Sequence, residues 1–196
     1  MIFVWKTHKQ LMKINKRELS VCQRDELKFD NTFKIYLLQR SFMEYRKATI
    51  EEAQAVCDIV QETKARIYPH YYTQAVVDFF GRLHSIDNIK QDIAEGRINV
   101  LIVDGKMIGT GSRTDHHITR VYVLPEYEGK GYGTVIMDYL EEEIFQEYGH
   151  CDLDASLPAA IFYEHRGYRT VEHRKHDIGG GEVMIYEIMR KEKSRI

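Results

Sequence analysis

The chain has 196 residues, of which 43% are hydrophobic and 30% charged, and its formal net charge is −2. This length suffices for one domain with a sizeable core, and the composition is typical of a soluble globular protein. The longest apolar runs are too short to cross a bilayer, so we expect no membrane partner. The first residues lack the features of a signal peptide, and the three cysteines, Cys22, Cys57 and Cys151, have no paired spacing. These features predict a reduced, cytoplasmic protein.

Charge is distributed unevenly along the chain. Residues 1–42 carry nine Lys or Arg and four Asp or Glu, a net +5, whereas the other 154 residues carry 19 and 26, a net −7. A basic arm on an acidic domain can bind nucleic acid. We favour a disordered extension, or sequence upstream of a true start at Met43, where a new strand pattern begins. We therefore predict a basic extension over residues 1–42, a domain over residues 43–196, and no nucleic-acid partner.

Three helical segments are expected after a short strand that ends at Thr49. Apolar residues recur at helical spacing from Ala53 to Val60. Capping residues and breakers mark the segments: the first begins at the capping box Thr49-Ile-Glu-Glu52 and ends before Pro69, the second is capped by Thr73 and stopped by Gly81, and the third is capped by Ser85 and ends before Gly96.

Strand patterns follow, with two further helices among them. Asp104-Gly105 is a strong hairpin signal between the first two of these strands. The expected strands are 98–103, 107–112, 116–124, 152–156, 168–173 and 182–189, and the expected helices lie between Gly133 and Gly149 and over 158–166. This order predicts an α+β domain in which helices cover a mostly antiparallel sheet.

The segment from Val121 to Thr134 joins an apolar strand to a helix through a loop with glycine at 129, 131 and 133. The first N–H groups of a helix have no intrahelical partner, and the helix dipole favours an anion there. Glycine lets the backbone approach a ligand closely, although these glycines can also serve only to shape a tight turn. Neither the dinucleotide fingerprint nor the P-loop fits this spacing.

Two motifs resemble those of the GNAT N-acetyltransferases. The family's acyl-CoA motif is Gln/Arg-x-x-Gly-x-Gly/Ala after a strand that often ends Tyr-Val-x-Pro, and here Glu128-Gly-Lys-Gly-Tyr-Gly133 follows Tyr122-Val-Leu-Pro125. Glu128 departs from the family's Gln or Arg. The segment Ser156–Tyr168 is similar to Asn-x-x-Ala-x-x-Phe-Tyr-x-x-x-Gly-Phe, with Ser in place of Asn. The resemblance covers the chain from Met43 to about Arg190.

The resemblance implies a GNAT-like fold over residues 43–196, with a mixed, mostly antiparallel central sheet covered by helices on both faces. It implies acetyl-CoA as co-substrate, and direct acetyl transfer to a primary amine in a ternary complex. The implied cofactor-binding residues lie on the strand, the glycine loop and the second motif: Val121, Tyr122, Val123, Glu128, Gly129, Lys130, Gly131, Tyr132, Gly133, Thr134, Ser156 and Ala159.

Tyr163 matches the position of the family's general acid. A phenol, with an ordinary pKa near 10, keeps its proton at neutral pH and can donate it to a leaving thiolate. His117 lies where related sequences carry a candidate base, and an imidazole can accept a proton from an ammonium group. Packing in the core is the alternative for Tyr163, and a strand-edge position beside His116 is an equally supported alternative for His117.

The resemblance places Tyr71, Tyr72 and His70 in the wall that receives the acceptor, where aromatic rings can hold an amine by cation–π contact or simply pack in the core. His173 and His176 form an incomplete metal set, so we expect no metal. The expected partner is a small-molecule amine, and a homodimer is left open. The alternatives are a non-catalytic module that binds or senses acyl-CoA, and an acetyltransferase for protein N-termini or lysines.

Overall fold

The computed structural model describes residues 42–194. The basic extension predicted for residues 1–42 lies almost wholly outside the described residues, and the domain boundary at Met43 stays a prediction. None of the helices in the described part is long and apolar enough to cross a membrane.

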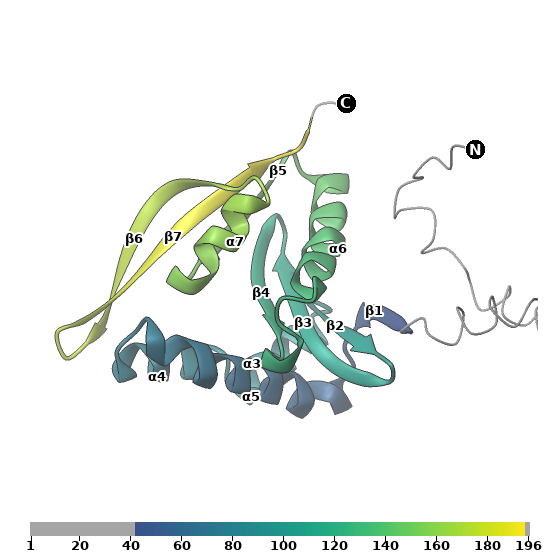
Figure 1. Cartoon of the computed structure of the whole chain (residues 1–196), viewed down its shortest axis with the longest axis horizontal. Coiled ribbons are helices and arrows are strands. Elements are labelled where there is room, and N and C mark those ends of the chain that lie inside the picture. The colour runs from purple at the N-terminus through teal and green to yellow at the C-terminus, as the bar shows by residue number, and fades with distance from the viewer. Residues whose placement is uncertain (1–41, 195–196) are drawn as a thin grey trace, which may run out of the picture. The chain divides into compact units, whose positions relative to one another are not determined.

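Seven strands form a single sheet in the order β1-β2-β3-β4-β5-β7-β6 (Figure 1). Their bounds are β1 (Met43–Lys47), β2 (Ile98–Val103), β3 (Lys106–Thr114), β4 (His117–Val123), β5 (His150–Ala155), β6 (Arg169–Gly179) and β7 (Glu182–Glu192). Neighbouring strands are antiparallel except β4 and β5, which run parallel. The predicted mostly antiparallel sheet is therefore confirmed.

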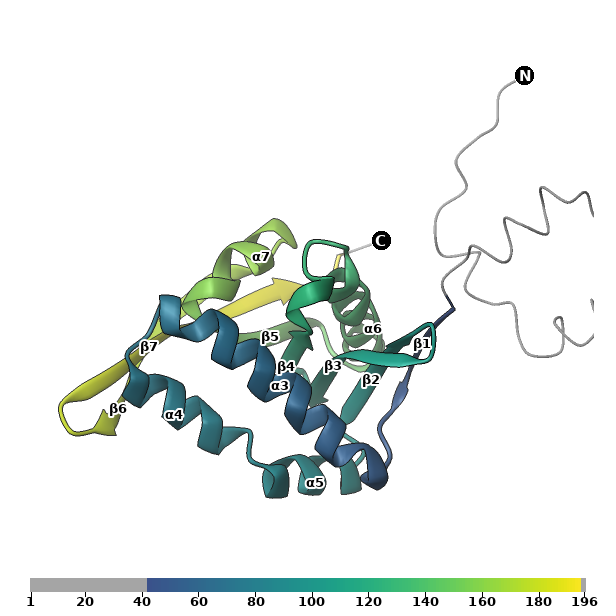
Figure 2. The same ribbon diagram turned by 60° about the horizontal axis from the view of Figure 1, so that its bottom comes forward.

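Among the residues that the structure describes, five α-helices cover the sheet. Their bounds are α3 (Ala53–Ile67), α4 (Gln74–Leu83), α5 (Ile86–Ala94), α6 (Tyr132–Glu147) and α7 (Ala160–His165). Helices α3, α4 and α5 lie on one side of the sheet, and α6 and α7 lie on the other (Figures 1 and 2). The predicted α+β class, with helices on both faces, is confirmed.

The ends of the early helices follow from local hydrogen bonds. The carboxylate of Glu52 accepts the Thr49 N–H at 2.8 Å, which completes the predicted capping box before α3. The prediction that Gly81 stops α4 is wrong, because α4 continues to Leu83. The side-chain amide of Gln61 donates to the carbonyls of Gly81 and His84 at 3.3 and 3.0 Å, and it thereby satisfies acceptors at the helix end.

Helix α6 packs directly on β3 at Gly111, where the absence of a side chain leaves room for Ile136. A Cβ atom at Gly111 would lie 2.5 Å from Cγ2 of Ile136 and 2.6 Å from the hydroxyl of Tyr45. Ile136 and Leu140 of α6 are fully buried in the main core. This contact positions the start of α6, and with it the glycine loop, against the centre of the sheet.

The last two strands form a hairpin longer than predicted. The pattern ended the first strand at His173, but β6 runs to Gly179. Most β6 side chains are exposed, so the strand lacks the apolar alternation that would have extended the prediction. The three glycines from 179 to 181 have positive φ angles and form the tight turn only at the strand's end.

Candidate active site

Strands β4 and β5 separate soon after they begin. They pair at only two positions, His117 with Asp152 and Ile118 with Leu153, after which β4 continues for five residues and β5 for two. Within the described residues, the facing edges beyond these pairs have no strand partner, and Figure 1 shows β5, β7 and β6 turning away from β4. Backbone groups on such free edges can hydrogen-bond an extended ligand.

A β-bulge in β4 decides which side chains face this opening. Ile118 and Arg120 pair with consecutive residues of β3, so Thr119 is an extra residue. The extra residue reverses the alternation of side chains along the strand. As a result Ile118 packs in the core under α6, whereas Tyr122 packs against α3.

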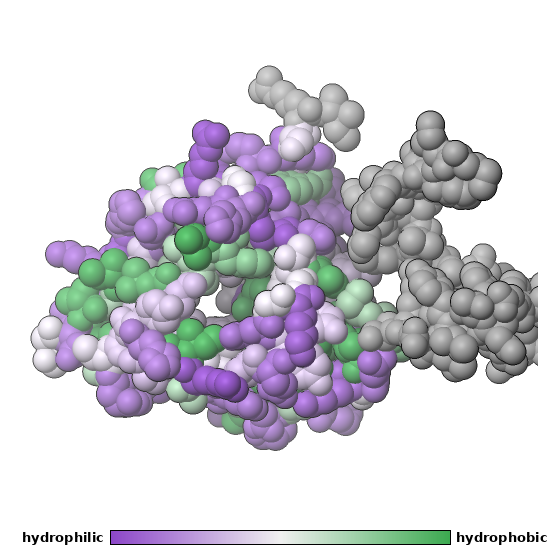
Figure 3. All heavy atoms as spheres, viewed as in Figure 1, coloured by the Kyte–Doolittle hydropathy of each residue, from purple (hydrophilic) through white to green (hydrophobic). Residues whose placement is uncertain are grey.

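A cleft of about 440 Å³ opens at the separation. Its walls come from α3 and α4 on one side and from α7 and the β6–β7 hairpin on the other, and Figure 3 shows a hollow between these layers. The lining residues include Tyr68, Phe79, Phe80, His84, Thr119, Arg120, Val121, Tyr122, Asp154, Ser156, Ala159, Tyr163, His176, Met184 and Tyr186. The lining is largely apolar and aromatic, with a few polar groups that can orient a ligand.

The glycine loop forms an open turn at the start of α6. Gly129 and Gly131 have φ angles of +70° and +85°, which a side chain would disfavour, and Gly131 is the N-cap of α6. A Cβ atom at either position would meet no heavy atom within 4 Å, so the space beside the turn is free. The N–H of Val135 makes the helix's first bond, to the carbonyl of Gly131 at 3.1 Å. The N–H groups before it are free to bind an anion.

Lys130 belongs to this turn, and Lys106 lies near it, beside Tyr127. The ammonium groups of Lys106 and Lys130 lie 5.2 and 5.1 Å from the ring centre of Tyr127. Lys106 also forms an ion pair of 3.1 Å with Glu126. The turn therefore combines free N–H groups, the positive end of a helix dipole and two nearby cations, which together favour a phosphate ligand.

Comparison with known proteins decides the family. Residues 67–180, more than half of the chain, match the Acetyltransferase (GNAT) domain. The chain belongs to the GNAT acetyltransferase family. The uncharacterized N-acetyltransferase YafP of Escherichia coli (strain K12) is 26% identical over 91 residues, which are 46% of this chain and 58% of YafP. The chain therefore spans less than two thirds of this curated GNAT relative.

Solved GNAT structures share the fold. A GCN5-related N-acetyltransferase from Rhodopseudomonas palustris superposes with a TM-score of 0.70 at 22% identity, over 76% of this chain and 95% of that one. The PaiA N-acetyltransferase from Thermoplasma acidophilum, in complex with coenzyme A, gives 0.61 at 19% identity over 78% and 99%. The putative acetyltransferase yncA from Salmonella typhimurium, with acetyl-CoA, gives 0.60 at 18% identity over 80% and 96%.

Tyr163 belongs both to the GNAT core and to the lining of the cleft. Its side chain is 8% exposed, and its ring packs edge-on against Phe162 and Tyr168 with centroids 5.3 and 5.8 Å apart. Burial, and then the neighbouring Tyr68, raises the pKa of Tyr163 far above its ordinary value. The hydroxyl therefore keeps its proton at neutral pH, and Tyr163 is one of the residues that line the cleft.

A chain of buried and partly buried polar groups, absent from the sequence predictions, runs along the opposite wall. Arg120 donates from Nε to Nδ1 of His84 at 3.0 Å, and Nε2 of His84 lies 3.3 Å from the hydroxyl of Tyr122. That hydroxyl lies 3.4 Å from the hydroxyl of Tyr68. Arg120 is itself paired with Asp92 of α5. An arginine within an apolar strand was the one sequence signal for this network, since a buried charge needs a partner.

The predicted cofactor-binding residues divide between the cleft and the turn. Val121, Tyr122, Ser156 and Ala159 line the cleft. The side chain of Ser156 makes no capping hydrogen bond to the short 3₁₀ helix that follows it. Val123 is outside the lining, and its carbonyl accepts from the Thr63 hydroxyl at 3.1 Å. The remaining members form the exposed turn and the first residues of α6: Glu128, Gly129, Lys130, Gly131, Tyr132, Gly133 and Thr134.

The aromatic residues predicted for the acceptor wall lie beside the cleft. Tyr71 and His70 are exposed, and neither they nor Tyr72 are among the lining residues of the described cleft. Tyr72 instead accepts a hydrogen bond from the Leu157 N–H at 2.7 Å, so it joins the loop before α4 to the loop after β5. The aromatic lining residues on this wall are Tyr68, Phe79 and Phe80.

His117 lies one residue away from the cleft. Its Nε2 is 3.6 Å from Oδ1 of Asp154, and Asp154 lines the cleft while His117 does not. The β6–β7 hairpin supplies a lining that the sequence did not reveal, since its first strand was expected to end too early. These hairpin residues are His176, Met184 and Tyr186.

Proposed function

We propose that this chain is an acyl-CoA-dependent N-acyltransferase that transfers an acetyl group from acetyl-CoA to a primary amine by direct attack. The observation that carries the proposal is the meeting of Tyr163 with the free edge of β4 in a single cleft beside the glycine turn. Family membership and a fold shared with structures that hold coenzyme A or acetyl-CoA support it.

Acetyl-CoA fits three observed features. Its pyrophosphate would lie at the start of α6, where Gly129 and Gly131 leave open space and free N–H groups. Lys130 and Lys106 would add positive charge there. Its pantetheine amides would pair with the free edge of β4 after Ile118. The acyl carbonyl would then reach the cleft.

Two groups in the cleft match the needs of acyl transfer. A backbone N–H on the free edge of β4 would polarise the thioester carbonyl, as an oxyanion hole does. The new C–N bond forms as the C–S bond breaks, and the leaving sulfur gains a proton from the hydroxyl of Tyr163. Because its raised pKa keeps Tyr163 protonated, the proton is in place when the sulfur leaves.

The cysteines support direct attack rather than a covalent enzyme intermediate. Cys57 and Cys151 are buried and unpaired, and Cys22 lies outside the described residues. Burial raises the pKa of the Cys151 thiol to about 11, which keeps it from acting as a nucleophile. Unpaired thiols also agree with work in a reducing compartment, and we propose the cytoplasm.

The walls of the cleft favour a small amine with an apolar or aromatic body. Phe79, Phe80 and Tyr186 offer ring surfaces, and Asp154 offers a carboxylate for an ammonium group. We assign proton removal to the pair of Asp154 and His117, since Asp154 faces the cleft and His117 lies 3.6 Å behind it.

An amine screen with acetyl-CoA, read out as free thiol, tests the function. A primary amine that is turned over, with a stoichiometric acetylated product, supports it. Binding of acetyl-CoA without turnover of any amine would instead support the sensing alternative. The pH dependence of kcat/KM tests the assignment of the base. If His117 takes part, the fall in kcat/KM at low pH should not depend on the pKa of the acceptor amine and should disappear in His117→Ala. A fall that follows the pKa of the acceptor and persists in His117→Ala would contradict the assignment.

A further inference from the structure

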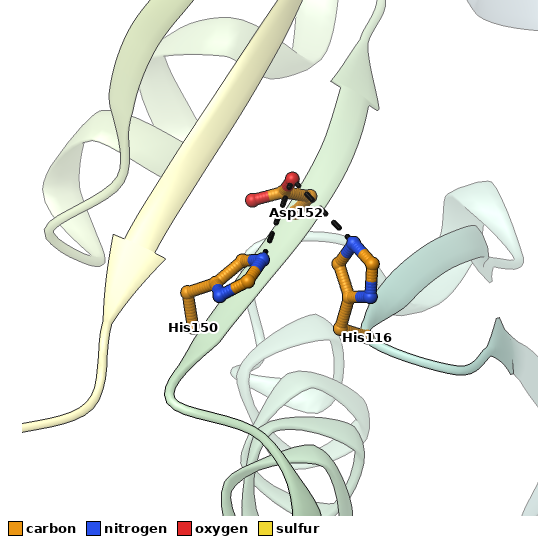
Figure 4. A group of neighbouring side chains, drawn as sticks. All are labelled: His116, His150 and Asp152. Atoms are coloured by element: carbon orange, nitrogen blue, oxygen red, sulfur yellow. Dashed lines mark ion pairs between the residues drawn. The ribbon is translucent and has the colours of Figure 1, made fainter.

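The fold assembles a cluster of metal-binding side chains away from the cleft lining. His150 and Asp152 are two residues apart on β5, so their side chains lie on the same face of the sheet. His116 immediately precedes β4, and its carbonyl accepts the Asp152 N–H at 2.9 Å. The parallel junction of β4 and β5 thus brings three side chains together, as Figure 4 shows.

The donor atoms of the cluster converge. Nε2 of His116 and Nε2 of His150 lie 3.8 and 4.0 Å from the same oxygen, Oδ2 of Asp152. All three ligand atoms lie within 4.8 Å of one another. Zinc bonds of about 2.1 Å in tetrahedral geometry need donor separations of roughly 3.4 Å. Because about a third of each histidine side chain is exposed, the rings have room to rotate and close the remaining distances, which are about 0.4 and 0.6 Å to Oδ2 and at most about 1.4 Å between any two ligand atoms.

The carboxylate is oriented by a partner of its own. Arg190 of β7 donates from Nε to Oδ1 and from its terminal nitrogen to Oδ2 of Asp152, both at 2.7 Å. This fork uses one lone pair on each oxygen and leaves one on Oδ2 directed to the histidines. Hydrogen-bonded carboxylates of this kind are usual around metal sites. The positive charge of Arg190 would repel a bound cation. Glu192 pairs with His150 in the strand register, and its negative charge offsets part of this repulsion.

We propose that His116, His150 and Asp152 bind a divalent transition-metal ion of the zinc class. Two imidazoles and one carboxylate suit zinc, cobalt, nickel and iron, whereas magnesium and calcium prefer oxygen ligands alone. The ion would join the start of β4 to β5 at the junction that only two residue pairs hold. Its role would be structural: it would hold the two strands together at the base of the cleft, and it would take no part in acetyl transfer.

Zinc titration of the full chain, treated first with a chelator, tests the proposal. Calorimetry should show saturable binding of one ion, and Zn²⁺ should raise the melting temperature. His116→Ala and His150→Ala should each weaken binding by at least about tenfold, judged against the 10- to 100-fold loss seen for outer partners of metal sites. His173→Ala, on the exposed part of β6, is the matched control and should bind zinc as the wild type does.

Bound Co²⁺ gives a second readout that does not depend on activity. Its visible absorption should show the intense bands of a four- or five-coordinate site, and these should be lost in His150→Ala. Asp152→Asn also leaves Arg190 without its partner, so the histidine variants carry the test. The absence of saturable binding, or unchanged affinity in both His116→Ala and His150→Ala, or an equal loss in His173→Ala, would overturn the proposal.

Discussion

Arg120 donates a hydrogen bond from Nε to Nδ1 of His84, and this contact determines how the partly buried imidazole is protonated. An arginine Nε–H only donates, so Nδ1 must accept, and the proton of neutral His84 lies on Nε2. Nε2–H can then donate to the hydroxyl of Tyr122, 3.3 Å away. Burial, followed by the charges of Arg120 and Lys64, lowers the pKa of His84 to about 3. His84 lines the cleft, but it is not a base at neutral pH.

His84 should make the domain lose stability in mild acid. The unfolded chain takes up a proton on this histidine below pH about 6.5 and the folded protein only near pH 3, so the folded state binds fewer protons in between. Its contribution is complete above pH 6.5 and falls by about 1.4 kcal/mol per pH unit below it. Urea unfolding at pH 7, 6 and 5 measures this slope. His84→Gln should flatten the slope and the exposed His173→Gln should not; parallel slopes in wild type and His84→Gln would contradict the assignment.

Tyr163→Phe should lower kcat by about 10²- to 10⁴-fold, the usual contribution of a general acid. The affinity for acetyl-CoA should not change, because the ring and its packing remain. Tyr168→Phe is the matched control: Tyr168 is also buried, but its hydroxyl donates to the sulfur of Cys151 at 3.1 Å, and the residue lies outside the cleft lining. Turnover numbers and calorimetric affinities check both variants. Equal kcat in wild type and Tyr163→Phe would leave Tyr163 with a packing role alone.

Gly131→Asp should abolish the rise in melting temperature that we expect acetyl-CoA to produce. The new carboxylate would stand at the N-terminus of α6, in the open space where we place the pyrophosphate. Gly131→Asn adds nearly the same volume without the charge, and asparagine tolerates the left-handed backbone at this position. The two variants should therefore fold alike and differ in ligand response. A full response in Gly131→Asp would show that the phosphates bind elsewhere.

Gly111→Ala should destabilise the fold by about 1–3 kcal/mol, the range for overpacking a core. Its Cβ would come within 2.5 Å of Ile136 and 2.6 Å of Tyr45, so α6 must move away from β3. Gly149→Ala is the matched control. Its Cβ would point into open space at an exposed position, so the free energy of unfolding should change by less than about 0.5 kcal/mol. Chemical denaturation measures both. A Gly111→Ala protein as stable as Gly149→Ala would mean that α6 does not depend on this close contact.

Most of the fold could be predicted from local sequence patterns. The capping box at Thr49, the Asp104-Gly105 turn and the glycines at 129 and 131 each need only neighbouring residues, and the structure has a turn or helix start at every one. The fold class could be predicted from the order of the expected helices and strands along the chain. The length of β6 did not, because an exposed strand lacks apolar alternation.

Side chains that meet through strand pairing were not predictable in this way. His84 and Arg120 lie 36 residues apart, and their contact depends on where α4 ends and on the bulge at Thr119. The cluster of His116, His150 and Asp152 could not be predicted for the same reason. His116 and His150 are far apart in the sequence and come together because β4 and β5 run parallel. In the sequence, His173 and His176 are close enough together to suggest metal ligands, but they form an incomplete set.

The short contact between β4 and β5 also bears on how long the protein survives in a cell. Only two residue pairs join β4 to β5, so the two parts of the sheet are weakly connected there. Local opening at this junction would expose the backbone to proteases. A ligand whose amides fill the gap would close it as a further strand would, and a free concentration 100 times the dissociation constant adds about 2.7 kcal/mol to stability. The abundance of the protein would then follow the supply of that ligand, so that a shortage of the ligand would also lower the amount of the protein.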